Sequence, residues 1–144
     1  MHPRWIANEH DARLKRLAGK LDRVLVDAPC TGLGTLRRNP DLKWRQSEQT
    51  LAERRVKQDV ILAAAARLVK PGGLLLYATC SLLDEENAQV VESFRATHAQ
   101  FELRPASAAL AQQRIALDTG EYLRLAPHLH GTDGFFAALL AKKT

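Results

Sequence analysis

Two cysteines are the side chains in this sequence most suited to covalent chemistry. Cys30 comes three residues after Asp27, at the end of the apolar run 24–28, and Cys80 comes two residues after the run 74–78. Each run is typical of a buried strand. Successive strands joined by one crossover helix are usually parallel neighbours, so both thiols should reach the same edge of a sheet. A thiolate there could act as a nucleophile. Two small buried apolar side chains are the alternative.

Asp27 ends the first apolar run with a carboxylate. A carboxylate cannot stay buried without a partner. We therefore expect Asp27 to face the ligand crevice at the carboxyl ends of the strands. The alternatives are a helix cap or an ion pair with Arg23 or Lys43.

The segment 30–46 predicts a long loop, which in a compact domain is more often functional than not. Cations neutralise phosphates and aromatic rings stack on bases, so such a loop can form a nucleic-acid-binding patch. The net charge of +5 suits a polyanionic partner. A solvated loop is the alternative. The candidate patch residues are Arg37, Arg38, Lys43, Trp44 and Arg45.

The elements that must position these side chains alternate between strand and helix, which predicts an α/β fold with a mostly parallel sheet and flanking helices. One helix should begin after Ser47 or Thr50, run to about Lys70 and stop at Pro71-Gly72-Gly73. A second should span 84–97 behind a Ser81–Asp84 capping box. Further strands are expected at 101–103 and 135–141, separated by the less regular stretch 105–133. The expected buried residues are Ala52, Val56, Val60, Ala64 and Leu68 in the first helix, and Ala88, Val91 and Phe94 in the second.

Composition and motif spacing exclude several classes of protein. The 144 residues are 46% hydrophobic and 26% charged, which suits one globular domain. The longest apolar runs fall well short of the roughly 20 residues of a membrane span, and the N-terminus lacks a secretory h-region. Two cysteines do not form a disulfide framework and indicate the reducing cytoplasm. No metal site is expected, because His128 and His130 lack ligand-pair spacing. Glu85 and Glu86 are interpreted as first-turn acids of a helix.

Four separated blocks of the sequence resemble the RNA 5-methylcytosine methyltransferases, in particular the bacterial RsmB/Fmu/Sun group that methylates a cytosine of 16S ribosomal RNA. The resemblance covers about residues 22–142 and implies the C-terminal half of a Rossmann-like fold that depends on S-adenosylmethionine. The blocks are DAPCTGLG (27–34), RRNPDLKW (37–44), KPGGLLLYATCSLLDEEN (70–87) and DGFFAALLAK (133–142).

The resemblance implies a role for each reactive residue. Cys80, in the TCS block, would add to carbon 6 of the target cytosine, after which carbon 5 takes the methyl group from S-adenosylmethionine. Cys30, in the DAPC block, would assist release of the methylated base. Asp27 would contact the cytosine ring and lie near the cofactor, and Asp11 would lie near the adenine. The basic loop would bind RNA, and the target base must be unstacked to reach the thiols.

The resemblance also implies what is missing. The family's glycine-rich cofactor loop and the acidic residue of its second strand have no counterpart in 1–144, nor does an N-terminal RNA-binding domain. We therefore expect residues 1–144 to be a partial catalytic domain that begins near the fourth strand. It should be inactive alone, with an exposed sheet edge through which it self-associates. The alternative is a non-catalytic RNA-binding or interaction module derived from this fold.

Overall fold

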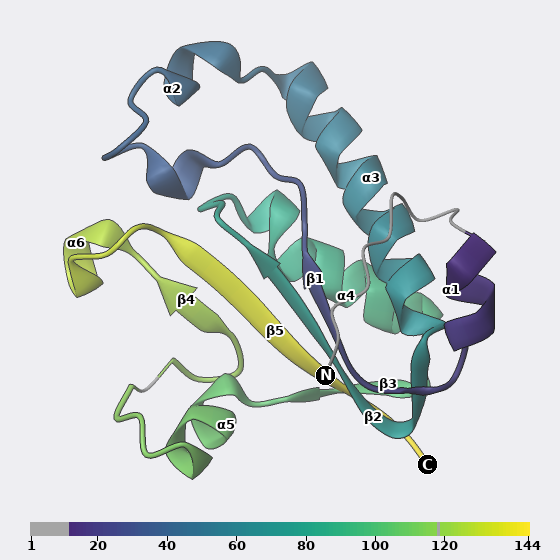
Figure 1. The fold of residues 1–144 in the computed structure, drawn as a ribbon. Coiled ribbons are helices and arrows are strands. Elements are labelled where there is room, and N and C mark those ends of the chain that lie inside the picture. Colours follow the sequence, from purple (N-terminus) through teal and green to yellow (C-terminus); the bar gives the residue numbers. More distant parts are fainter. Residues whose placement is uncertain (1–11, 118) are drawn as a thin grey trace.

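The computed structural model describes residues 12–117 and 119–144 of the chain. Its described part forms a five-stranded sheet in the order β1-β2-β5-β3, with β4 paired to β5 (Figure 1). The strands are β1 (Leu21–Asp27), β2 (Val69–Thr79), β3 (Phe101–Arg104), β4 (Leu123–Leu125) and β5 (Phe135–Lys142). The helices are α1 (Ala12–Leu17), α2 (Leu42–Arg45), α3 (Glu48–Ala66), α4 (Ala88–Thr97), α5 (Ala106–Gln112) and α6 (Pro127–His130), with 3₁₀ turns η1 (Leu33–Thr35) and η2 (Asp84–Glu86).

The strand directions confirm the predicted α/β class. β1 and β2 are parallel, and β5 is antiparallel to β2, β3 and β4. The other four strands therefore run in one direction, and β5 runs against them from the middle of the sheet. The sequence predicted the strand of β5 but not its direction, because an apolar run with no polar alternation reads the same either way.

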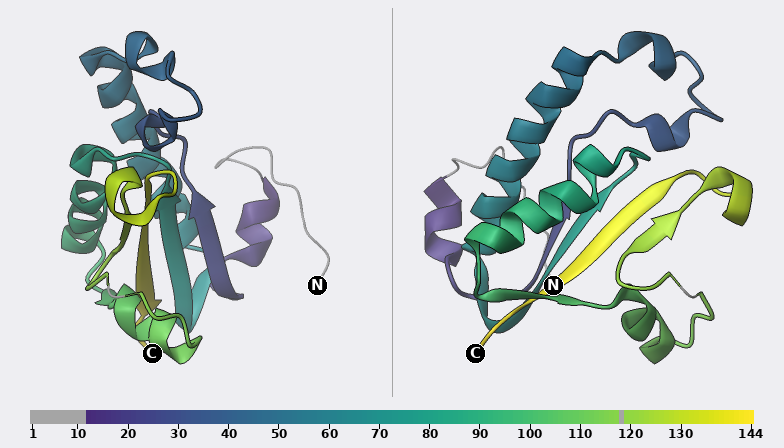
Figure 2. Two further views of the ribbon diagram at one scale, coloured as in Figure 1. Left: turned by 90° about the vertical axis from the view of Figure 1, so that its left-hand side faces the viewer. Right: turned by 180° about the vertical axis from the view of Figure 1, so that it is seen from behind.

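The hydrophobic core lies between the sheet and the helices α3 and α4, which cover the same face (Figure 2). Strand side chains point alternately to the two faces, so every second residue of β1, β2 and β5 enters this core. Its members include Val26, Leu75, Tyr77, Phe136 and Leu140 from the sheet, Leu62 from α3, and Val90, Val91 and Phe94 from α4.

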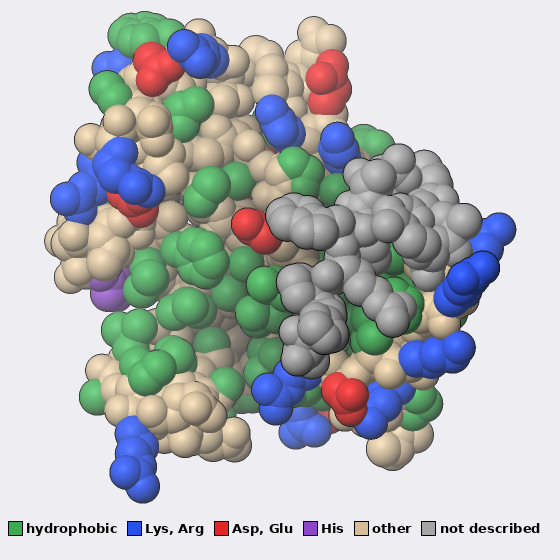
Figure 3. Space-filling view, in the orientation of Figure 1, with side chains coloured by type: hydrophobic (Ala, Val, Ile, Leu, Met, Phe, Trp, Pro, Cys, Tyr) green, Lys and Arg blue, Asp and Glu red, His purple; other side chains and the backbone are tan. Residues whose placement is uncertain are grey.

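The opposite face of the sheet is open over its first strand. Leu25, Leu76 and Leu139 are cross-strand partners on this face, and Leu25 is 65% exposed. Figure 3 shows apolar side chains gathered on this side of the molecule. The run 24–28, which is typical of a buried strand, is therefore buried on one face only within the described residues. Among the described strands, β1 lies at an edge of the sheet, as expected.

The first long helix differs from its prediction at the C-terminus and in its buried face. Ser47 is the N-cap, and its hydroxyl accepts a hydrogen bond from the Thr50 amide at 3.1 Å. The chain leaves the helix after Ala66 and is already a strand at Val69, so Pro71-Gly72-Gly73 lies inside β2. These three residues fall within an irregularity in the β1–β2 register, between the pairs Leu21–Val69 and Arg23–Leu74.

Of the predicted stripe, Leu68 is buried as expected, just after the helix ends, but Ala52, Val56 and Val60 are exposed because the residues were spaced strictly four apart. With 3.6 residues per turn, such a row drifts about 40° around the helix at each step and leaves the core face. Val56 is 64% exposed and Val60 is 42% exposed. The face that is buried combines spacings of three and four, through Gln58, Leu62, Ala65 and Ala66.

The second predicted helix is interrupted at Asn87, between η2 and α4. Val91 and Phe94 are buried as predicted, whereas Ala88 is half-buried and the neighbouring Val90 is fully buried. The Ser81 hydroxyl accepts from the Leu83 amide at 3.1 Å, so the predicted capping box does not form. None of the helices in 12–117 and 119–144 combines the length and apolar character needed to cross a membrane.

Candidate active site

The carboxyl ends of β1 and β2 bring the two cysteines together, as predicted. The parallel register pairs Asp27 with Ala78, and each strand then continues into the loop that carries its cysteine. The sulfur atoms of Cys30 and Cys80 lie 3.4 Å apart, within hydrogen-bonding distance. Both thiols are free and half-buried. This contact allows one sulfur to donate a hydrogen bond to the other.

The environment of Cys30 favours its protonated form. Burial is the main cause that raises the pKa of the Cys30 thiol above its usual range, and the contact with Cys80 adds to it. At neutral pH, Cys30 is therefore a thiol that can donate a hydrogen bond to the Cys80 sulfur. A donor beside a neighbouring sulfur suits chemistry in which that sulfur first attacks and later departs.

Two glycines let three loops converge on Cys80. The Gly34 amide donates to the Cys80 carbonyl at 2.8 Å, and the Gly134 amide donates to the Gly34 carbonyl at 2.8 Å. A Cβ atom added at Gly34 would lie 2.6 Å from the Cys80 carbonyl oxygen and would also collide with the Gly134 carbonyl. The sequence did not reveal this role. The only signal in the sequence is a glycine near a predicted strand, which is too common to identify a place where two backbone segments come into contact.

Glu86 is a buried carboxylate close to the two cysteine loops. It lies in the first turn of η2, as expected of a first-turn acid, but the sequence did not predict that it is fully buried. Its carboxylate accepts hydrogen bonds from Thr31 and from Gln58. Glu85 is exposed, as expected of a first-turn acid. A usable signal was Gln58, a polar residue one turn before Leu62 on the face of α3 that packs on the core.

Asp27 lies exposed at the carboxyl end of β1. Among the residues that the structure describes, it forms no ion pair with Arg23 or Lys43, so the ion-pair alternative is not realised there. Its carboxylate belongs to the open face of the sheet, alternating with the buried Val26 and Ala28. The prediction for Asp11 falls on a residue outside the described ranges.

The basic loop is exposed, and several of its cations have intramolecular partners. Arg37 donates to the Gly131 carbonyl at 2.6 Å, which joins this loop to the α6–β5 connection. Arg38 pairs with Asp133, and Arg45 pairs with Asp41 at 2.9 Å. The Lys43 ammonium lies 4.7 Å from the centre of the Trp44 ring, and this ring is 80% exposed. The loop therefore presents an exposed aromatic surface beside positive charge.

Comparison with known proteins decides the family. Residues 4–141 match the family model of the 16S rRNA methyltransferases RsmB/F. The chain belongs to the RsmB/F family. It is 44% identical over 122 residues to the probable ribosomal RNA small subunit methyltransferase B of Synechocystis, covering 85% of this chain and 27% of that protein.

Solved structures agree with the RsmB/F assignment. The crystal structure of PH0851 matches with a TM-score of 0.78 and 43% identity, over 87% of this chain and 27% of that one. NSun6 from Pyrococcus horikoshii, solved with SFG, matches with a TM-score of 0.71 and 29% identity, over 92% and 33% of the two chains. The resemblance drawn from the four sequence blocks is thereby confirmed. The chain spans less than a third of the length of its Synechocystis relative.

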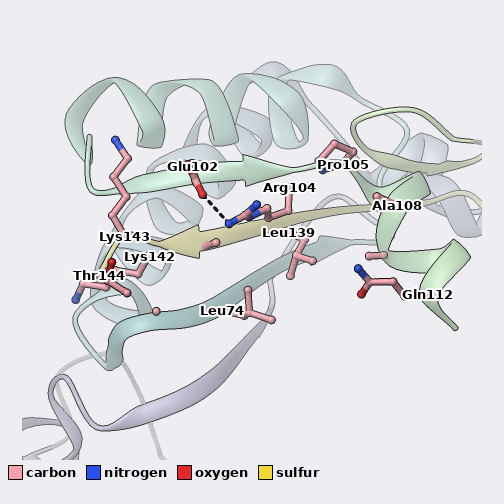
Figure 4. Close-up of a pocket in the computed structure, with 13 residues that line it drawn as sticks. Leu74, Glu102, Arg104, Pro105, Ala108, Gln112, Leu139, Lys142, Lys143 and Thr144 are labelled. Carbon is pink, nitrogen blue, oxygen red and sulfur yellow. Dashed lines mark ion pairs between the residues drawn. The ribbon is translucent and has the colours of Figure 1, made fainter.

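A groove with a volume of about 570 Å³ lies at the end of the sheet opposite the thiols. Its lining includes Leu74 of β2, Lys142 at the end of β5, and residues of α5 (Figure 4). Glu102 and Arg104 pair there at 2.8 Å. Within the described residues of this RsmB/F chain, no cluster of His, Cys, Asp and Glu is arranged to hold a metal ion.

Proposed function

We propose that this chain supplies the catalytic thiols of an RNA cytosine-C5 methyltransferase that acts on 16S ribosomal RNA in the cytoplasm. The observation that carries the proposal is the 3.4 Å contact between Cys30 and Cys80 at the carboxyl edge of two parallel strands. Carbon 5 of cytosine is a poor nucleophile, and covalent addition at carbon 6 divides one difficult step into two easier ones. RsmB/F membership supports the substrate class.

In the proposed reaction, the Cys80 thiolate adds to carbon 6 of an unstacked cytosine and forms a carbon–sulfur bond. The electron pair of the broken 5,6 double bond makes carbon 5 the nucleophile. Once carbon 5 is methylated, loss of its proton to a base restores the double bond, and the Cys80 sulfur leaves as a thiolate. Cys30, held as a thiol, donates a hydrogen bond to that departing sulfur. This accounts for its role in product release.

S-Adenosylmethionine would supply an electrophilic methyl group. The exposed Asp27 carboxylate at the end of β1 is a hydrogen-bond acceptor suited to the rim of a site for the base and the cofactor. Support for this cofactor comes from NSun6, whose structure was solved with SFG, an S-adenosylmethionine analogue. We propose that residues 1–144 hold only part of the cofactor site and that the isolated chain binds S-adenosylhomocysteine weakly or not at all.

The test uses a chimeric enzyme in which this chain replaces the matching segment of the Synechocystis relative. The assay measures transfer of labelled methyl groups to 16S rRNA. Cys80→Ser should abolish transfer, by roughly 10⁴-fold or more, because the nucleophile is lost. Cys30→Ser should form the adduct but release it slowly, which leaves protein–RNA complexes on denaturing gels. If Cys30→Ser abolishes transfer without an adduct while Cys80→Ser stays active, the assignment of the two roles is wrong.

A second candidate function is non-catalytic RNA binding, which the exposed Trp44 ring with Lys43 beside it favours.

We also propose that the chain self-associates through the edge of β1, where Leu25 is exposed. Light scattering during size-exclusion chromatography tests this self-association. A concentration-dependent increase in mass that Leu25→Lys suppresses would support it, and a monomer at every concentration would refute it.

A further inference from the structure

We propose that Glu86 and Asn87 are positioning residues for the two thiols, with Glu86 fixing the loop of Cys30 and Asn87 fixing the loop of Cys80. The two residues are adjacent in the chain, between η2 and α4. Each binds the neighbours of one cysteine and not the cysteine itself. The inference rests on the proposed function for its catalytic meaning, because it concerns the same two sulfur atoms.

Glu86 holds the peptide after Cys30 directly and the peptide before it through Gln58. Its carboxylate accepts from the Thr31 amide at 2.9 Å and from the Thr31 hydroxyl at 2.6 Å. The amide of Gln58 donates to the same carboxylate at 3.0 Å and also to the Pro29 carbonyl at 2.9 Å. The Pro29 carbonyl belongs to the peptide before Cys30, and the Thr31 amide belongs to the peptide after it. The orientation of the Cys30 side chain is therefore set from both sides.

Asn87 does the same for Cys80 with an amide group. Its side-chain oxygen accepts from the Thr79 hydroxyl at 2.5 Å, and its side-chain nitrogen donates to the Ser81 carbonyl at 3.0 Å. The Ser81 amide in turn donates to the Thr79 hydroxyl at 3.2 Å. The residues before and after Cys80 are thus held by one side chain.

The burial of this pair indicates a specific purpose. Glu86 is 0% exposed and Asn87 is 2% exposed. No ion pair of Glu86 occurs within 12–117 and 119–144, so three hydrogen bonds offset the cost of burying its carboxylate. An apolar residue would pack the helix against the core without that cost. What an apolar residue could not do is fix the two loops relative to each other.

The backbone arrangement brings both side chains into the same network. The helix is broken at Asn87, whose φ of −112° and ψ of −104° are not helical. The Tyr77 hydroxyl donates to the Glu86 carbonyl at 2.7 Å and anchors this break to the carboxyl end of β2. The Thr31 and Ser81 hydroxyls meet at 3.3 Å, which joins the two loops directly. The 3.4 Å distance between the sulfur atoms is the product of these contacts.

Near-isosteric variants separate positioning from general stability. Glu86→Gln replaces one carboxylate oxygen, an acceptor, with an NH₂ group, a donor. Because the partners on Thr31 and Gln58 are also donors, at least one hydrogen bond is lost. Asn87→Asp removes the donor to the Ser81 carbonyl. Glu85→Gln is the matched control, because it makes the same chemical change next to Glu86 on an exposed side chain.

The experiment measures how fast iodoacetamide alkylates each thiol of the folded 144-residue chain, by peptide mass spectrometry, with thermal unfolding followed in parallel. Glu86→Gln should speed alkylation of Cys30 relative to Cys80 by about tenfold, which corresponds to about 1.4 kcal/mol. Asn87→Asp should shift the ratio in favour of Cys80. Glu85→Gln should leave both rates unchanged. If Glu86→Gln does not fold, Thr31→Val tests the same contact by removing only the hydroxyl.

A purely structural role would raise both alkylation rates by one common factor, because both thiols would react through global unfolding. That result, or unchanged rates in every folded variant, would overturn the proposal. In the chimeric enzyme, Glu86→Gln should lower kcat and accumulate the RNA adduct, with the KM for RNA unchanged. If the thiol rates shift as expected but Cys80→Ser still transfers methyl groups, positioning stands and the proposed function fails.

Discussion

The two ends of the sheet differ in how they use polar groups. At the thiol end, the side chains of Thr31, Thr79, Glu86 and Asn87 are buried and hydrogen-bonded to one another or to loop backbone. At the opposite end, the pair Glu102–Arg104 is solvent-exposed. Buried hydrogen bonds fix geometry because leaving one unmade is costly, whereas exposed ion pairs contribute little. The difference indicates that buried side-chain hydrogen bonds fix the loops at the thiol end, whereas the Glu102–Arg104 pair contributes little to the structure at the opposite end.

The largest loss of stability is expected from Gly34→Ala. The added Cβ would collide with two backbone carbonyls that neither rotate nor move independently. We expect the free energy of unfolding to fall by about 3 kcal/mol or more, measured by urea denaturation. The control is Gly120→Ala, where nothing lies within 4 Å of the new Cβ and the cost comes from the φ of +70° alone. That control should lose about 1 kcal/mol. Equal losses of unfolding free energy in the two variants would show that the contact of Gly34 with the Cys80 and Gly134 loops does not contribute to stability.

A smaller contrast compares one hydrogen bond at each end. Tyr77→Phe removes the hydroxyl that donates to the buried Glu86 carbonyl and should lower the free energy of unfolding by about 1–2 kcal/mol. Glu102→Gln at the opposite end should change it by less than about 0.5 kcal/mol. Chemical denaturation of both variants checks the difference. Similar values for the two would remove the distinction between the ends.

The pH dependence of stability isolates Cys30. Its folded pKa is raised, so the unfolded chain loses this proton first as the pH increases. The stabilisation is therefore complete below the unfolded pKa near 9 and is lost as the pH rises above it. Relative to Cys30→Ser, the wild-type chain should lose stability between about pH 8.5 and 10 with a slope below about 1.4 kcal/mol per pH unit. Denaturation at pH 7, 9 and 10 measures it, and parallel curves would contradict the raised pKa.

The smallest effect concerns RNA binding at the two ends. Lys43→Ala should weaken binding of single-stranded RNA a few-fold and reduce the slope of log affinity against log salt by about one. Lys143→Ala at the opposite end is the matched control and should alter neither quantity as much. Fluorescence anisotropy at several salt concentrations checks both. Equal effects of the two variants would assign the binding to net charge rather than to the basic loop.

The sequence was sufficient to predict the strands, the parallel strand pair and one helix start. Two apolar runs, each followed by a cysteine, predicted the parallel pair and the meeting of Cys30 and Cys80. The N-cap at Ser47 and the last strand followed from similar local signals. These predictions held because they follow from local hydrophobic runs and local capping signals, together with the general rule that strands joined by one crossover helix are parallel neighbours.

What the sequence could not predict depends on contacts between distant segments. Glu86 differs from the exposed Glu85 only in which way it faces, and that is decided by Thr31, 55 residues away in the sequence. The buried face of α3 is set by a helix phase that a strict four-residue spacing misjudges. The direction of β5 depends on its connection through α6, which no hydrophobic pattern encodes.

The central claim is that Cys80 attacks the base while Cys30 assists its departure. The most direct measurement traps the reaction of the chimeric enzyme with RNA carrying 5-fluorocytosine at the target position, where fluorine on carbon 5 blocks the final elimination. Digestion and mass spectrometry then identify the peptide attached to the nucleotide. We expect attachment at Cys80, with Cys30 unmodified. Attachment at Cys30 would contradict it.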